Sequence, residues 1–243
     1  MRRKIIAVVL SLTILVGLGG IVAPQPVSAT SASQHIARYK ANMAAYKKHE
    51  QPIVDAFWKN YRGTLGQKLI KRAIWYMENG YMVYGHSNYA KDGKIDCSNF
   101  VSLIYKDFGF DITTRARDYN KVGRKVSGVY SRKQPGSSNK YELVGVNKLW
   151  VGDILLFWNK DSKGNRYISH VALYMGKFNG KPCIIHTVSG RPTAIGITNS
   201  FTWWYGEHFQ EARRIFPVKR YKARDPIIPA KYQLPPQNPV VYP

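Results

Sequence analysis

A helix that begins at a cysteine constrains this chain more than any other feature of its sequence. After Cys97 the apolar residues recur at helical spacing, at Phe100, Val101, Ile104, Tyr105 and Phe108, which predicts a helix with one buried face. Asp96 is a suitable N-cap and Gly109 a suitable stop. Backbone N–H groups in a first helical turn lack intrahelical acceptors, and the helix dipole there favours thiolate over thiol. We therefore interpret Cys97 as a candidate nucleophile that needs a base, because Asp96 beside it is anionic.

The N-terminus has the order of a secretory signal. Basic residues at positions 2–4 precede an apolar run over 5–23 and the small-residue sequence Val27-Ser28-Ala29. This order predicts cleavage after Ala29 and a protein that is secreted or held at the cell wall, without a stable membrane anchor. The alternative is an uncleaved anchor, since the run approaches membrane-spanning length.

The chain is strongly basic, with a formal net charge of +23. Cleavage would remove three basic residues and no acidic ones, leaving +20. Such a charge favours an anionic partner, and for a secreted protein we expect anionic cell-wall polymers rather than nucleic acid. The alternative is that the charge only keeps the protein soluble. We expect a monomer.

Composition divides the remaining chain into three parts. Residues 30–62 predict an amphipathic helical arm, with a second short helix after Pro52, for which packing on the domain is the default. Residues 63–217 predict one globular domain, in which Ser127 to Tyr141 is expected to be a surface loop. Residues 218–243 predict a basic, Pro-rich, extended tail.

Two histidines lie on predicted strands. Residues 152–158 form an apolar run, and residues 168–175 alternate so that His170 shares a face with Ala172 and Tyr174. Asn179-Gly180 then turns the chain into residues 182–188, where His186 shares a face with Ile184. The two runs predict an antiparallel hairpin with one histidine on each strand.

A helix-terminal cysteine followed by strand histidines is typical of a papain-type hydrolase. In this hypothesis His170 is the base for Cys97 and His186 holds its ring and tautomer. The alternative is that the cysteine and both histidines are structural. Cys183 is interpreted as a packed thiol, with a Cys97–Cys183 disulfide as the alternative. We expect no metal site or cofactor, because the other histidines lack ligand spacing.

Four blocks in order resemble the NlpC-type cell-wall cysteine peptidases: Asp96-Cys97-Ser98-Asn99-Phe100-Val101, Gly152-Asp153-Ile154-Leu155-Leu156-Phe157, Ser169-His170-Val171-Ala172-Leu173-Tyr174-Met175-Gly176 and Ile185-His186. The resemblance implies an α+β, papain-like domain whose N-terminal helices carry the nucleophile and pack on an antiparallel β-sheet. It also implies a triad of Cys97, His170 and His186.

The resemblance further implies cleavage of peptidoglycan stem peptides, commonly between D-γ-glutamate and a diamino acid. It suggests Asp96 and Ser98 as substrate-side residues, with helix capping as the alternative, and Tyr81 or Tyr84 for a pocket tyrosine. Asn99 stands where the family usually has Gly, and Met82 stands at the tyrosine position.

Two other functions remain open from the sequence. One is an N-acetylmuramoyl-L-alanine amidase that uses the same triad, and the other is a catalytically inactive, basic wall-binding module.

Overall fold

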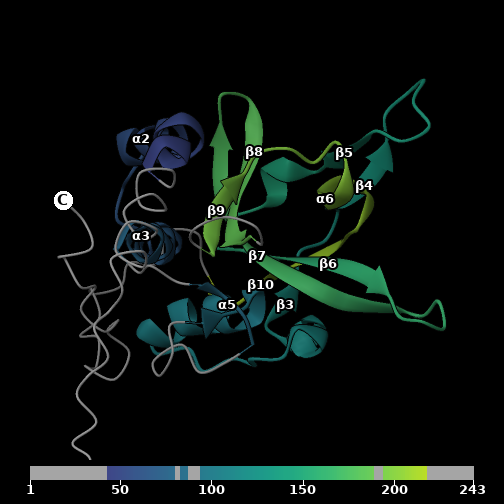
Figure 1. Cartoon of the computed structure of the whole chain (residues 1–243), viewed down its shortest axis with the longest axis horizontal. Helices are drawn as coiled ribbons and strands as arrows, with labels where there is room; N and C mark the ends of the chain where they lie inside the picture. Colours follow the sequence, from purple (N-terminus) through teal and green to yellow (C-terminus); the bar gives the residue numbers. More distant parts are fainter. Residues whose placement is uncertain (1–42, 80–82, 87–93, 189–193, 218–243) are drawn as a thin grey trace, which may run out of the picture.

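Six antiparallel strands form the central sheet of the computed structural model, which describes residues 43–79, 83–86, 94–188 and 194–217. The strand order is β3-β10-β6-β7-β8-β9 (Figure 1). Its members are β3 (Arg124–Lys125), β6 (Ile154–Lys160), β7 (Arg166–Phe178), β8 (Lys181–Thr187), β9 (Ile195–Thr198) and β10 (Phe209–Arg214). The predicted signal at 1–29 and the tail at 218–243 lie outside the described residues.

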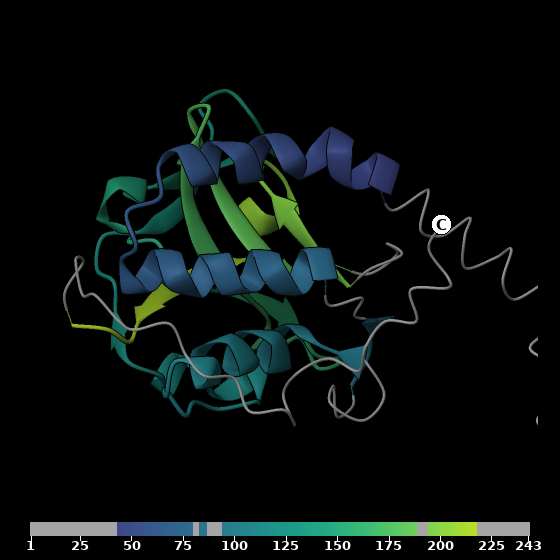
Figure 2. The same ribbon diagram turned by 90° about the vertical axis from the view of Figure 1, so that its left-hand side faces the viewer.

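Three helices cover one face of the sheet: α2 (Gln51–Lys59), α3 (Leu65–Asn79) and α5 (Cys97–Asp107). Figure 2 shows them side by side in front of the strands. Thr64 and Gln67 begin α3 as a capping box, since each accepts a hydrogen bond from the other's backbone N–H. Gly109 ends α5 with a φ of +82°, a conformation that glycine adopts without strain.

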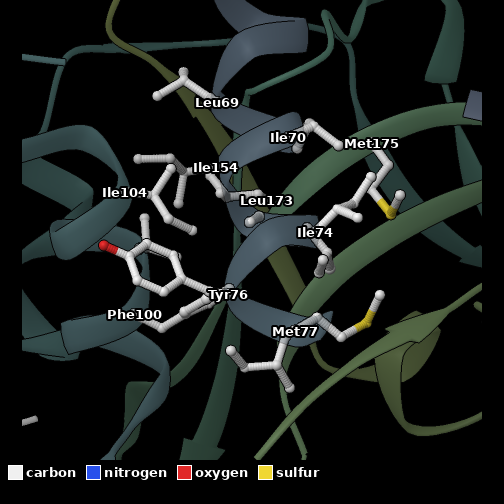
Figure 3. Packing of buried hydrophobic residues seen from close by; sticks show 14 of the residues in the cluster. Leu69, Ile70, Ile74, Tyr76, Met77, Phe100, Ile104, Ile154, Leu173 and Met175 are labelled. Carbon is white, nitrogen blue, oxygen red and sulfur yellow. The ribbon is translucent and has the colours of Figure 1, made fainter. Parts of the chain in front are cut away.

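The helix-side core joins these helices to the sheet. Figure 3 shows Leu69, Ile70 and Ile74 of α3 packed with Ile104 of α5 and Leu173 of β7, all of which are buried. Ile53, Val54 and Phe57 of α2 belong to the same core. The segment after Pro52 therefore packs on the domain, which was the default expectation for the arm; residues 43–49 before it are also helical.

The other face of the sheet carries a second apolar cluster under helix α6 (Trp204–Glu207). Ala172 and Tyr174 point to this side, whereas Val171, Leu173 and Met175 point to the helix side, which confirms the predicted alternation. The pairing of β7 with β6 shifts register once, because Phe157 pairs with His170 but Trp158 pairs with Ile168. Ser169 is thus the extra residue of a β-bulge, immediately before His170.

One expectation from the sequence was wrong, and one strand was missed. The expected loop from Ser127 to Tyr141 contains β4 (Tyr130–Lys133), which forms an antiparallel hairpin with β5 (Tyr141–Val144). Polar side chains hide this strand in the sequence, because both strands of the hairpin are at least partly exposed. The edge strand β9, in which Gly196 pairs with His186, was not predicted from the sequence.

The remaining elements are short. They are β1 (Val83–Tyr84) and β2 (Lys94–Ile95), which pair in parallel, and the 3-10 turns η1 (Ala116–Lys121) and η2 (Val146–Lys148). Because β2 ends two residues before Cys97, it leads the chain from the β1–β2 pair directly to the start of α5.

Candidate active site

Asp96 fixes the start of the helix that carries Cys97. Its backbone is extended, with φ −104° and ψ 178°, and its Oδ1 accepts hydrogen bonds from Asn99 N–H at 2.8 Å and from Ser98 Oγ at 2.9 Å. Burial raises the pKa of Asp96, but these donors and His86 outweigh burial and lower the pKa overall. Asp96 is therefore an ionised N-cap, and Ser98 holds it in place.

The Cys97 thiol is buried under the bulge of β7. Its Sγ lies 3.9 Å from the carbonyl oxygen of Ser169, and the backbone of Val171 also hydrogen-bonds to it. Burial raises the pKa of Cys97 to about 11, the Asp96 charge adds to this effect, and the backbone hydrogen bonds oppose it. The resting group is therefore a neutral thiol, packed against the backbone on both sides of His170.

His170 contacts His186 directly. His170 Nε2 lies 2.9 Å from His186 Nδ1, and the two rings meet edge to face. Burial lowers the pKa of His170 to about 4. Burial and the neighbouring His170 lower the pKa of His186 well below its usual value. Both imidazoles are consequently neutral at pH 7, the state a general base requires.

Two further groups hold the His186 ring. Its Nδ1 lies 2.9 Å from the carbonyl oxygen of Thr187, and its Nε2 lies 2.9 Å from Oγ1 of Thr198 on β9. His186 is fully buried, and Tyr205 packs edge-on against it with ring centroids 5.2 Å apart. The ring that contacts His170 is thus fixed on three sides.

The candidate substrate-side residues differ in their exposure to solvent. Asp96 and Ser98 are buried in the helix cap, whereas Tyr84 is 44% exposed. Burial raises the pKa of Tyr84, and the neighbouring Cys97 and Asp96 add to this effect. Tyr81 and Met82 lie outside the described residues.

Several neighbours of the site were not predicted from the sequence. His86 Nδ1 lies 2.8 Å from Asp96 Oδ2, and its side chain is 82% exposed. Trp204 and Tyr205 of α6 lie near His170, each with a ring-centroid distance of 6.2 Å. The aromatic cluster at 201–205 was the available signal for α6, but it did not indicate that these rings flank the histidines.

Both cysteines are free thiols, so the alternative of a Cys97–Cys183 disulfide is wrong. Cys183 is buried, in agreement with its interpretation as a packed thiol. Within the described ranges, no group of three or more His, Cys, Asp or Glu side chains is arranged to hold a metal ion. None of the helices in those ranges has the length and apolarity to cross a membrane.

The family model for the NlpC/P60 family matches residues 79–214, which is more than half of the chain. The chain belongs to the NlpC/P60 family. Its mixed architecture, with helices that precede an antiparallel sheet, is the papain-like α+β class expected from the sequence. Members of this family are generally cysteine peptidases.

The solved structures to which this chain is similar include the following three. An NlpC/P60 family protein from Bacillus cereus is 24% identical, with a TM-score of 0.44, over 64% of this chain and 42% of that one. An NLP/P60 family protein from Staphylococcus aureus, described as similar to a lipoprotein, is 21% identical, with a TM-score of 0.40, over 63% and 42%. NlpC1 from Trichomonas vaginalis is 16% identical, with a TM-score of 0.42, over 65% and 49%.

The match thus spans less than half the length of each of these three proteins. Comparison with curated proteins gives no match.

Proposed function

We propose that this protein is a secreted cysteine endopeptidase that hydrolyses stem peptides of peptidoglycan, with Cys97, His170 and His186 as its triad. The observation that carries the proposal is the position of the Cys97 thiol, at the first residue of α5 and against the backbone on both sides of His170. The contact between His170 and His186 adds the group that orients the base.

The chemistry begins from neutral partners. As Cys97 Sγ attacks the peptide carbonyl carbon, its proton passes to the free ring nitrogen of His170, and a C–S bond forms. The negative charge that develops on the carbonyl oxygen is stabilised by backbone N–H groups at the start of α5, where the helix dipole is positive.

The second half of the reaction regenerates the enzyme. His170 gives its proton to the leaving amine as the C–N bond breaks, and the acyl group remains on Cys97 as a thioester. His170 then takes a proton from water, whose oxygen attacks the thioester carbon. The C–S bond breaks, the acid product leaves, and Cys97 recovers its proton.

The bond that we propose is cleaved lies between D-γ-glutamate and the diamino acid, as the resemblance to NlpC-type peptidases implies. Digestion of purified wall sacculi, followed by mass analysis of the soluble products, tests this assignment. New amine termini on the diamino acid support it. Release of whole stem peptides from the sugar supports the amidase instead, and no release despite binding supports an inactive wall-binding module.

The net charge supports retention at the wall after secretion. A formal charge of +20 on the processed chain favours anionic wall polymers, and this attraction is screened by salt. Binding to sacculi should therefore weaken as salt increases and after chemical removal of the anionic polymers. Binding that is insensitive to both treatments contradicts a role for the charge.

A further inference from the structure

The Nδ1 atom of His186 has two neighbours, although an imidazole nitrogen makes one hydrogen bond in the plane of its ring. The carbonyl oxygen of Thr187 and Nε2 of His170 each lie 2.9 Å from it. A neutral imidazole has one N–H and one bare nitrogen, so Nδ1 either donates or accepts. Both rings are neutral, because burial lowers their pKa values. The tautomer of His186 therefore decides which nitrogen of His170 carries the proton.

In one tautomer the site is unproductive. If the His186 proton is on Nδ1, it points at the Thr187 carbonyl and at Nε2 of His170. Nε2 of His170 must then be bare, and its proton lies on Nδ1. Because Nε2 is occupied by the contact with His186, Nδ1 is the nitrogen left for Cys97, and in this tautomer it cannot accept a proton.

The opposite tautomer prepares the base. If the His186 proton is on Nε2, the bare Nδ1 accepts a hydrogen bond from Nε2–H of His170, and Nδ1 of His170 is free. This arrangement needs an acceptor for the buried Nε2–H of His186, since an unsatisfied buried donor is unfavourable. Thr198 Oγ1, 2.9 Å away, can be that acceptor.

We propose that Thr198 is a positioning residue, whose hydroxyl holds His186 in the Nε2–H tautomer and thereby leaves His170 able to take the Cys97 proton. This inference rests on the proposed function. The hydroxyl accepts a hydrogen bond from Nε2–H of His186. This bond offsets the hydrogen bond that the Thr187 carbonyl would accept if the proton were on Nδ1. In this proposal Thr198 acts through its contact with His186.

The first test separates the hydroxyl from the packing. Valine has nearly the shape of threonine but cannot accept a hydrogen bond, whereas serine retains the hydroxyl. For soluble muropeptides we expect Thr198→Val to lower kcat about 10- to 100-fold, as found when the hydrogen-bond partner of a metal-ligating histidine is removed, with KM nearly unchanged. Thr198→Ser should restore most of kcat.

A matched control removes a hydroxyl from β4. Ser131 Oγ on β4 is buried and has no hydrogen-bond partner among the described residues. Ser131→Ala should therefore leave kcat and KM unchanged. Loss of activity in this variant equal to that in Thr198→Val, or a Thr198→Val enzyme with wild-type kcat, would overturn the proposal.

The second test needs no substrate. Nitrogen-15 NMR of histidine-labelled protein reports which ring nitrogen of His186 is protonated. We expect Nε2–H in the wild type and in Thr198→Ser, and Nδ1–H in Thr198→Val. If the valine variant does not fold, the wild-type spectrum remains decisive, because a proton on Nδ1 of His186 contradicts the proposal.

The two tests also separate this inference from the proposed function. If the wild type releases nothing from sacculi, the peptidase proposal fails, whereas the spectra still decide the role of Thr198. If the wild type is active and Thr198→Val is equally active, the peptidase proposal stands and the role of Thr198 is wrong.

Discussion

The ionisation of Cys97 leads to a quantitative prediction about its reactivity. Burial raises the pKa of Cys97 from 9.0 to about 11. At pH 7 about one molecule in ten thousand then carries the thiolate, roughly 100-fold fewer than for a cysteine with a pKa of 9.0. The thiolate is the form that reacts with alkylating agents. Alkylation of Cys97 at pH 7 should therefore be about 100-fold slower in the folded protein than in the unfolded chain.

The assay is the rate of iodoacetamide alkylation in Cys183→Ser, a variant in which Cys97 is the one remaining cysteine. Between about pH 6 and about pH 10 the rate should rise roughly tenfold for each pH unit, because the thiolate fraction does. The urea-unfolded variant is the control. A fast rate that is independent of pH between about 6 and 8 would refute the reasoning, since it requires a thiolate–imidazolium pair that exists before substrate binds.

Three further predictions concern stability. Arg214 donates a hydrogen bond to Asp153 Oδ1 at 2.7 Å, and Asp153 is fully buried. Arg214→Leu should therefore lower the free energy of unfolding in urea by about 3–5 kcal/mol. A loss below about 1 kcal/mol contradicts the importance of the pair. The pKa of His170 is 6.5 in the unfolded chain and about 4 in the folded protein. Neutral His170 therefore contributes up to about 3 kcal/mol to the free energy of unfolding; this contribution is complete above pH 6.5 and is lost as the pH falls toward 4. A weaker pH dependence in His170→Gln checks this assignment, and an unchanged one refutes it. Asp96→Ala should cost about 1 kcal/mol by removing the N-cap of α5, whereas Asp96→Asn should cost less; equal losses contradict a capping role.

The sequence predicted the elements whose signals are local. The N-cap at Asp96, the stop at Gly109 and the faces of the strands that carry His170 and His186 are all confirmed. Each depends on residues a few positions apart, so helical spacing, strand alternation and capping chemistry sufficed.

The features that the sequence did not predict depend on pairing between strands that lie far apart in the sequence. The bulge at Ser169 changes the register of β7 against β6 by one residue, and no local pattern marks it. Thr198 reaches His186 because β9 pairs with β8, and β9 was hidden by its Gly196. The β4–β5 hairpin was missed because its polar strands lack a buried face.

The most direct test of a Cys97 peptidase is digestion of purified sacculi by the wild type, Cys97→Ala and Cys183→Ala, with the released peptides measured by mass spectrometry. We predict that the wild type and Cys183→Ala release fragments that begin with the diamino acid, and that Cys97→Ala binds the sacculi but releases none. Release of the same fragments by Cys97→Ala at the wild-type rate would contradict the account.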